Sequence, residues 1–417
     1  MDRHIVASIP GRKCYTNLWV SNTHIFEEFF AQERVEVLNF KPLEQFIDHI
    51  TSWRIPWADC LVMYRNEPVF RYMNGYADID AGIPIDDRRI INLYSMTKIL
   101  TCTAALQLYE KGKFLLSDPL ASYMPEFSDM LVKKPSADGG FILEKATKPI
   151  TVRDLFTMTA GFSYDISAPS IRDVLERTNG AATTRDIAGA IAKEPLLFEP
   201  GTRWNYSLCH DVLAAFVEAV DGRKFSEYAR AEITGPLGMK DTGFALSDEQ
   251  MSRLAPQYAF NDELGVPVPK DGNGYRLSTA FESGGAGLYS SVSDYAIFLN
   301  ALTNRGASAD GVRILSPAAV ELMRTDHLTE EMRADFAWLP LAGYGFGLGV
   351  RTHISKAKSG SLSPLGEFGW SGAGGCLAVI DPDTQLTVMY AQHLLNNQEP
   401  YVHPRLKNIV YACLNDD

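Results

Sequence analysis

One long segment without proline or glycine, residues 95–111, constrains the fold more than any other feature. It is apolar on nearly every side, with Ile99, Leu100, Cys102, Ala104, Ala105, Leu106 and Leu108 distributed around the helix. A surface helix carries an apolar stripe on one side only, so a helix that is apolar all round must be buried. Gly112, which follows directly, is a typical helix end. The sequence therefore predicts a central helix over residues 95–111.

Strand patterns lie near both ends of the chain, and helical patterns lie between them. We predict two strands within residues 58–78, joined at Asn66-Glu67, and later strands over 344–353, 374–382 and 385–393. Helices are predicted over 42–53, 151–160, 183–196, 207–222, 292–304 and 405–414. This order favours an α/β fold whose sheet is built from both ends of the chain.

The same order of elements predicts how the chain divides into domains. Residues 41–115 and 281–417 are expected to form one discontinuous α/β domain, which a mostly helical domain, residues 116–280, interrupts. Residues 1–40 show no clear period, and we treat them as an N-terminal extension.

Ser95 and Lys98 stand three residues apart at the start of the predicted central helix. Side chains at i and i+3 lie on one helix face and can touch. The helix N-terminus favours negative charge developing on a serine oxygen, and a desolvated lysine can accept a proton. The pair is therefore typical of an activated nucleophile, the alternative being a lysine that extends to water. A second Ser-x-x-Lys, Ser355 to Lys358, precedes a loop rich in glycine, serine and proline.

Composition limits the classes of partner that we expect. The chain has 417 residues, of which 46% are hydrophobic and 22% charged, and its formal net charge of −12 argues against binding nucleic acid or an anionic membrane. No apolar stretch approaches the roughly 20 residues of a membrane span, and the N-terminus does not resemble a secretory signal. The sequence does not indicate an oligomeric state.

Cysteine and histidine spacing gives two further expectations. The six cysteines are scattered without CxxC spacing, which predicts free thiols and a cytoplasmic protein. The eight histidines contain no His-x-x-x-His pair. We therefore expect neither a metal site nor a cofactor.

Two further motifs follow Ser-x-x-Lys along the chain. Tyr206 comes after a Pro-Gly turn in FEPGTRWNYSL, and Trp370, Ser371 and Gly372 open a glycine-rich late strand. In this order the three motifs resemble those of the class C β-lactamase and DD-peptidase superfamily of serine hydrolases, and most of all its family VIII carboxylesterases. The resemblance covers roughly residues 42–415. It implies a β-lactamase-like (transpeptidase) fold, an antiparallel sheet flanked by helices, with the active site in the cleft between the two domains.

The resemblance also implies a role for each matching residue. Ser95 would be the nucleophile, Lys98 its base, and Tyr206 the group that relays a proton to the leaving group. Which of Lys98 and Tyr206 accepts the serine proton is left open. The backbone N–H groups of Ser95 and Ala373 would form the oxyanion hole, with Trp370–Gly372 beside the substrate.

Two positions depart from the family pattern. Leu208 stands where an asparagine usually holds the substrate amide, and Trp370 stands where a lysine or histidine usually binds a carboxylate. Leucine and tryptophan can contact apolar substrate surface, but they cannot neutralise an anion. We therefore expect a carboxylesterase that acts on small neutral esters, with weak β-lactam hydrolysis. An acyltransferase of the same fold and a β-lactamase or D-aminopeptidase-type hydrolase remain alternatives.

Three other interpretations are less favoured. Ser371 lies in GWSGA, but a nucleophile elbow must lead into a helix, and a glycine-rich strand is predicted here. Ser207, His210 and Asp211 are too close along one helix to face each other as a triad. A non-enzymatic binding protein of this fold would be expected to lack one of the three motif residues, and all are present.

Overall fold

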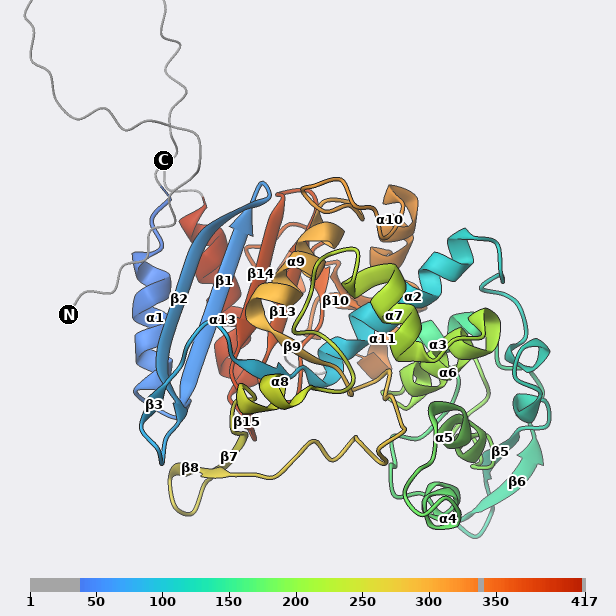
Figure 1. Cartoon of the computed structure of the whole chain (residues 1–417). Coiled ribbons are helices and arrows are strands. Elements are labelled where there is room, and N and C mark those ends of the chain that lie inside the picture. Colours follow the sequence, from blue (N-terminus) through green and yellow to red (C-terminus); the bar gives the residue numbers. More distant parts are fainter. Residues whose placement is uncertain (1–37, 337–340, 415–417) are drawn as a thin grey trace, which may run out of the picture.

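The main sheet has eight antiparallel strands in the order β10-β11-β12-β13-β14-β1-β2-β3 (Figure 1). The computed structural model describes residues 38–336 and 341–414, so the predicted N-terminal extension lies almost wholly outside the described residues. The strands are β1 (Trp57–Tyr64), β2 (Glu67–Asp78), β3 (Ile83–Pro84), β10 (Tyr344–Phe346), β11 (Arg351–His353), β12 (Phe368–Gly369), β13 (Leu377–Asp381) and β14 (Leu386–Ala391). Both ends of the chain therefore build the sheet, as predicted.

Local chemistry explains how the two ends of the chain meet. Strands β1 and β2 are joined at Arg65 and Asn66, which both have positive φ angles, 52° and 69°, as a tight hairpin requires. Strand β14 pairs with β1 on one side and with β13 on the other, and all six of its residues are buried. The mostly apolar sequence of β14 is typical of a strand covered on both faces.

Helices cover both faces of this sheet. Helices α1 (Lys41–Thr51) and α13 (Glu399–Cys413) pack together on one face, and α9 (Val292–Thr303) lies on the other (Figure 1). The buried residues of α1 are Leu43, Phe46, Ile47 and Ile50, the helical spacing read from the sequence. They share a core with the sheet and α13, whereas the other face of the sheet belongs to a larger core.

The predicted central helix is α2 (Thr97–Glu110), and its residues from Thr97 to Leu108 are all buried. It packs against α6 (Cys209–Asp221), which ends at Gly222 in the left-handed conformation. A short 3₁₀ turn, Tyr94–Met96, leads into α2. The central position predicted for this helix is confirmed.

The remaining elements are short. The helices are α3 (Val152–Thr157), α4 (Pro169–Arg177), α5 (Thr184–Ile191), α7 (Phe225–Ala229), α8 (Asp248–Ser252), α10 (Pro317–Arg324), α11 (Glu330–Phe336) and α12 (Lys356–Ser359). The minor strands are β4 (Ile90–Asn92), β5 (Leu131–Pro135), β6 (Phe141–Lys145), β7 (Tyr258–Asn261), β8 (Val266–Pro269), β9 (Tyr289–Ser291) and β15 (Leu394–Leu395). The large core includes residues from both sides of positions 116 and 280, and the two-domain division stays a prediction.

Two predicted elements differ from the structure. The single strand predicted over 344–353 is a hairpin of β10 and β11, because the chain reverses at Gly347–Gly349, where Gly349 has a φ of 82°. The last helix begins at Glu399 rather than at residue 405 and continues through Pro404. Within residues 38–336 and 341–414, none of the helices has the length and apolar character needed to cross a membrane.

Candidate active site

Ser95 lies at the turn that joins β4 to α2. Tyr94, the residue before it, has a φ of 49°, a left-handed conformation that is uncommon for a residue with a side chain. Burial of the Tyr94 side chain and its hydrogen bond to Gln257 Oε1 (2.5 Å) hold this turn. Ser95 itself is half-buried and stands at the N-terminal end of the central helix.

Lys98 is completely buried one turn beyond Ser95. Its Nζ donates hydrogen bonds to Ser95 Oγ (3.2 Å) and to the backbone carbonyl of Gly285 (2.7 Å). The contact predicted between the two side chains is therefore present, and the interpretation of Lys98 as a lysine extending to water is wrong.

Tyr206 reaches Ser95 from a distant part of the chain. Its hydroxyl donates a hydrogen bond to Ser95 Oγ at 2.6 Å, and Lys98 Nζ lies 4.7 Å from the centre of its ring. The ring of Trp370 stacks on the ring of Tyr206, with centroids 5.9 Å apart and planes 11° apart. Four predicted residues (Ser95, Lys98, Tyr206 and Trp370) are thus brought together.

Gly372 brings the third motif against the nucleophile turn. A Cβ atom at Gly372 would lie 2.3 Å from the carbonyl oxygen of Leu93, so only glycine fits. This close approach places Ala373 beside the segment that carries Ser95. Ala373 is exposed, and its carbonyl accepts a hydrogen bond from Asn397 Nδ2 at 2.8 Å.

Two predicted site residues point elsewhere. The hydroxyl of Ser371 donates to Glu399 Oε1 (2.6 Å), away from Tyr206. Leu208 is buried where α6 begins, and it lines a small separate cavity of about 90 Å³. The structure therefore does not bring these two side chains to Ser95.

Asp211, a buried carboxylate outside the three motifs, holds the turn whose Gly285 carbonyl accepts from Lys98. Asp211 Oδ1 accepts hydrogen bonds from Ser283 Oγ (2.5 Å) and from the backbone N–H of Gly285 (3.2 Å). Burial raises the pKa of the Asp211 carboxyl, while the Ser283 hydrogen bond and the charge of Lys98 act in the opposite direction. The glycine-rich sequence SGGAG was the available signal for this turn, whose Gly285 carbonyl holds Lys98.

The profile of the Beta-lactamase family matches residues 43–412, nearly the whole described chain. The chain belongs to the β-lactamase family. The family and the β-lactamase-like fold expected from the motifs are confirmed. Together with similarity to an esterase, the family makes this protein a serine hydrolase.

Several relatives are similar over most of their length. Protein Rv1367c of Mycobacterium tuberculosis (strain ATCC 25618 / H37Rv) is 35% identical over 323 residues, which are 76% of this chain and 80% of that protein. Esterase EstB of Burkholderia gladioli is 30% identical over 363 residues, 81% and 85% of the two chains. The solved structure of EstCE1, described as a hydrolase with promiscuous acyltransferase activity, superposes with a TM-score of 0.72 at 24% identity. The superposition covers 90% of this chain and 97% of that chain.

The other nucleophiles considered in this β-lactamase-family chain lack suitable partners. Ser207 Oγ donates to Cys209 Sγ (3.1 Å), and His210 Nε2 lies 3.1 Å from the Phe156 carbonyl oxygen. Burial, followed by the charge of Lys98, lowers the pKa of His210 to about 3, so that the ring is neutral. Strand β13, not a helix, follows Ser371. In the described part of the chain, no group of histidine, cysteine and acidic residues could hold a metal ion.

Proposed function

We propose that this protein is a serine carboxylesterase that hydrolyses small neutral esters through an acyl-enzyme on Ser95. The observation that carries the proposal is the pair of hydrogen bonds at Ser95 Oγ, one from Lys98 Nζ and one from the Tyr206 hydroxyl. Both groups can exchange a proton with the serine, which is what activation of a nucleophile requires.

In the acylation step, Ser95 Oγ attacks the ester carbonyl carbon while its proton passes to Lys98 or Tyr206. The tetrahedral oxyanion would accept hydrogen bonds from the backbone N–H groups of Ser95 and Ala373. When the intermediate collapses, the bond to the alcohol oxygen breaks and Tyr206 supplies the proton that the alcohol needs. The products of this step are a free alcohol and an ester on Ser95.

In the deacylation step, water attacks the acyl group on Ser95. The same Lys98–Tyr206 pair removes one proton of the water and returns a proton to Ser95 Oγ when the acyl bond breaks. A carboxylic acid leaves, and the starting state is restored. The reaction consumes one water molecule and needs no cofactor.

Aromatic residues around the serine support a neutral substrate. The ring of Tyr206 contacts Trp370 on one side and lies 5.1 Å from the ring of Tyr164 on another. Trp370 in turn meets Phe346 edge-on at 5.3 Å. These rings favour an apolar acyl or alcohol group over an anion. The 30% identity to an esterase supports the same substrate class.

The proposed location of the substrate follows the domain prediction. Tyr206 comes from the mostly helical stretch 116–280, whereas Ser95 and Trp370 come from the parts that precede and follow it. A substrate held by all three residues would lie in a cleft between two domains. A cytoplasmic location, also proposed, is supported by the buried free thiols of Cys60, Cys102, Cys209 and Cys376 in the described part of the chain.

Substituting the nucleophile tests the proposal. The Ser95→Ala protein should melt like wild type and lose essentially all turnover of p-nitrophenyl butyrate. The matched control is Ser355→Ala, which removes the serine of the second Ser-x-x-Lys sequence and should keep wild-type activity. Turnover retained in folded Ser95→Ala protein would refute the mechanism. A higher kcat/KM on a penicillin than on the butyrate ester would refute the substrate class.

Acyl transfer is the second candidate function. An acyl group on Ser95 can pass to an alcohol instead of water, and the description of EstCE1 names such an activity for that protein. The two functions are separated by adding an alcohol acceptor to the ester assay. A transferase should form the new ester in preference to the free acid, and a hydrolase should release the acid.

A further inference from the structure

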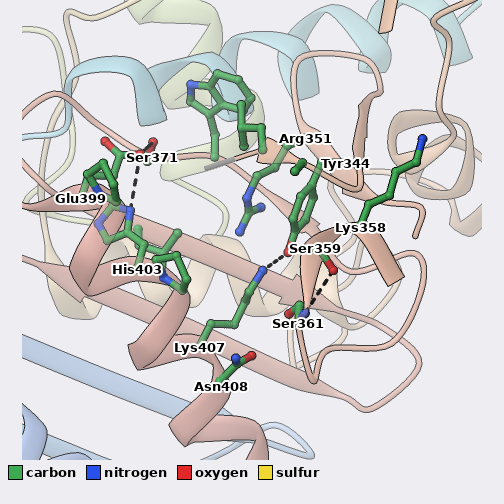
Figure 2. Close-up of a pocket in the computed structure, with 16 residues that line it drawn as sticks. Tyr344, Arg351, Lys358, Ser359, Ser361, Ser371, Glu399, His403, Lys407 and Asn408 are labelled. Atoms are coloured by element: carbon green, nitrogen blue, oxygen red, sulfur yellow. Dashed lines mark hydrogen bonds and ion pairs between the residues drawn. The ribbon is translucent and has the colours of Figure 1, made fainter. Parts of the chain in front are cut away.

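A large cavity lies behind the Trp370–Ser371 strand entry, and the proposed chemistry does not use it. Its volume is about 560 Å³, and its walls include residues of β11, of α12 and of α13 from Glu399 to Asn408. This volume is within the range of small-molecule sites, about 300–1,000 Å³. Figure 2 shows Ser371 and Glu399 at one end and Ser359 and Ser361 at the other.

Two buried cations point toward the middle of this cavity, Arg351 from β11 and Lys407 from α13 (Figure 2). They share one buried carboxylate. Arg351 Nη2 donates to Glu367 Oε1 at 3.0 Å, and Lys407 Nζ donates to Glu367 Oε2 at 3.2 Å. Lys407 also contacts the Tyr344 hydroxyl, and Arg351 Nη2 lies 3.4 Å from the Ala378 carbonyl oxygen.

One buried donor in this cluster has no acceptor within the described part of the chain. Burial would raise the pKa of Glu367, but the charges of Arg351 and Lys407 outweigh it and lower the pKa. Glu367 is therefore ionised and compensates one of the two positive charges. Arg351 Nη1 is buried without a hydrogen-bond partner among the residues that the structure describes. Because a buried charged donor without an acceptor is costly, Arg351 favours a further anionic acceptor in the cavity.

The neighbouring carboxylate of Glu399 makes its hydrogen bond to another residue. Glu399 Oε1 accepts the Ser371 hydroxyl at 2.6 Å and lies 3.5 Å from His403 Nδ1. Burial raises the pKa of the Glu399 carboxyl, but the interaction with His403, the Ser371 hydrogen bond and the charge of Arg351 outweigh it and lower the pKa. Trp370, Leu377 and Pro400 add apolar surface to the walls of the cavity.

We propose that this cavity binds an organic monocarboxylate, whose charge pairs with Arg351 and Lys407 and whose apolar part lies against Trp370 and Leu377. A carboxylate oxygen supplies the acceptor that Arg351 Nη1 lacks in the described structure, and the apolar wall distinguishes an organic acid from an inorganic anion. The cavity shares Trp370 with the proposed ester site but is not lined by Ser95, Lys98 or Tyr206, so ligand binding is tested separately from ester hydrolysis.

The test measures binding to the full-length protein by calorimetry, with benzoate as the probe at up to about 10 mM. Benzamide has nearly the same shape without the charge, and inorganic phosphate has charge without the apolar body. We expect saturable binding of benzoate and at least about tenfold weaker binding of the other two. Binding of benzamide as tight as that of benzoate, or no benzoate binding, would overturn the proposal.

Two variants locate the site. Arg351→Gln removes one of the two cations and should weaken benzoate binding about tenfold or more. Because this change can also disturb folding, Pro404→Trp is the second variant. Pro404 is exposed at the cavity wall, where a tryptophan side chain would fill the cavity. The substitution keeps all charges and restores a backbone N–H to helix α13. Arg405→Gln, which removes an exposed charge from the next helix position, is the control. Benzoate binding that survives Pro404→Trp unchanged would place the ligand elsewhere and refute the site.

Discussion

Replacing Tyr206 by phenylalanine removes one hydroxyl group and leaves the ring contacts of the side chain in place. The hydroxyl donates to Ser95 Oγ at 2.6 Å, whereas the ring stacks on Trp370 and lies 4.7 Å from Lys98 Nζ. The variant therefore separates the proton-transfer role of Tyr206 from its packing role. We expect a large fall in kcat and almost no change in stability.

The two magnitudes follow from these contacts. One hydrogen bond at a half-buried group contributes about 1 kcal/mol to folding, which shifts Tm by only about 1 °C in a protein of 417 residues. A positioned proton donor or acceptor contributes about 100- to 10,000-fold to the rate, or about 3–5 kcal/mol of barrier. The effect on catalysis should thus exceed the effect on stability several-fold.

The assay compares kcat on p-nitrophenyl butyrate with Tm for wild type, Tyr206→Phe and a matched control. The control is Tyr164→Phe, the same change on a ring 5.1 Å from that of Tyr206. It should keep kcat within a few-fold of wild type, because the bond to Ser95 remains. A Tyr206→Phe protein with wild-type kcat would show that Lys98 alone moves the protons, and the proposed relay would be wrong.

Three further predictions concern buried charged groups. Lys98→Arg should be as damaging as Lys98→Ala, about 100- to 10,000-fold in kcat, because arginine stays protonated; wild-type turnover in the arginine variant would contradict a base role. Asp211→Ala should lower kcat about 10- to 100-fold by releasing the Gly285 turn, while Asp211→Asn, which keeps an acceptor oxygen, should retain most of it; equal losses in both variants would argue against positioning. Glu367→Gln should destabilise the fold by about 3–5 kcal/mol at pH 7, because Lys407 loses its carboxylate. The pKa of Glu367 is lowered from 4.5 in the folded state, so this stabilisation is present above pH 4.5 and is lost as the pH falls through the lower folded value. Urea unfolding of the wild-type and Glu367→Gln proteins at neutral and acid pH measures this difference in stability. The same difference at the two pH values would contradict the prediction.

Contacts between near neighbours in the chain could be predicted from the sequence. The i, i+3 spacing of Ser95 and Lys98 on an apolar helix was enough to predict that their side chains meet. The first hairpin and the strands β13 and β14 followed from alternation, apolar runs and turn residues. Proline misled the prediction of the last helix, because Pro404 is tolerated inside α13, where the sequence rule predicts a helix boundary.

The tertiary structure decided which distant groups complete the site. Tyr206 meets Ser95 across 111 residues, and the Gly285 carbonyl meets Lys98 across 187. No periodicity encodes such contacts, since they depend on how helices and strands pack. Ser371 illustrates the same limit, because its sequence motif is next to the site while its side chain points to Glu399. The sequence by itself was enough to predict which residues would carry the chemistry, and packing determined the direction in which each side chain points, because direction depends on neighbours far apart in the chain.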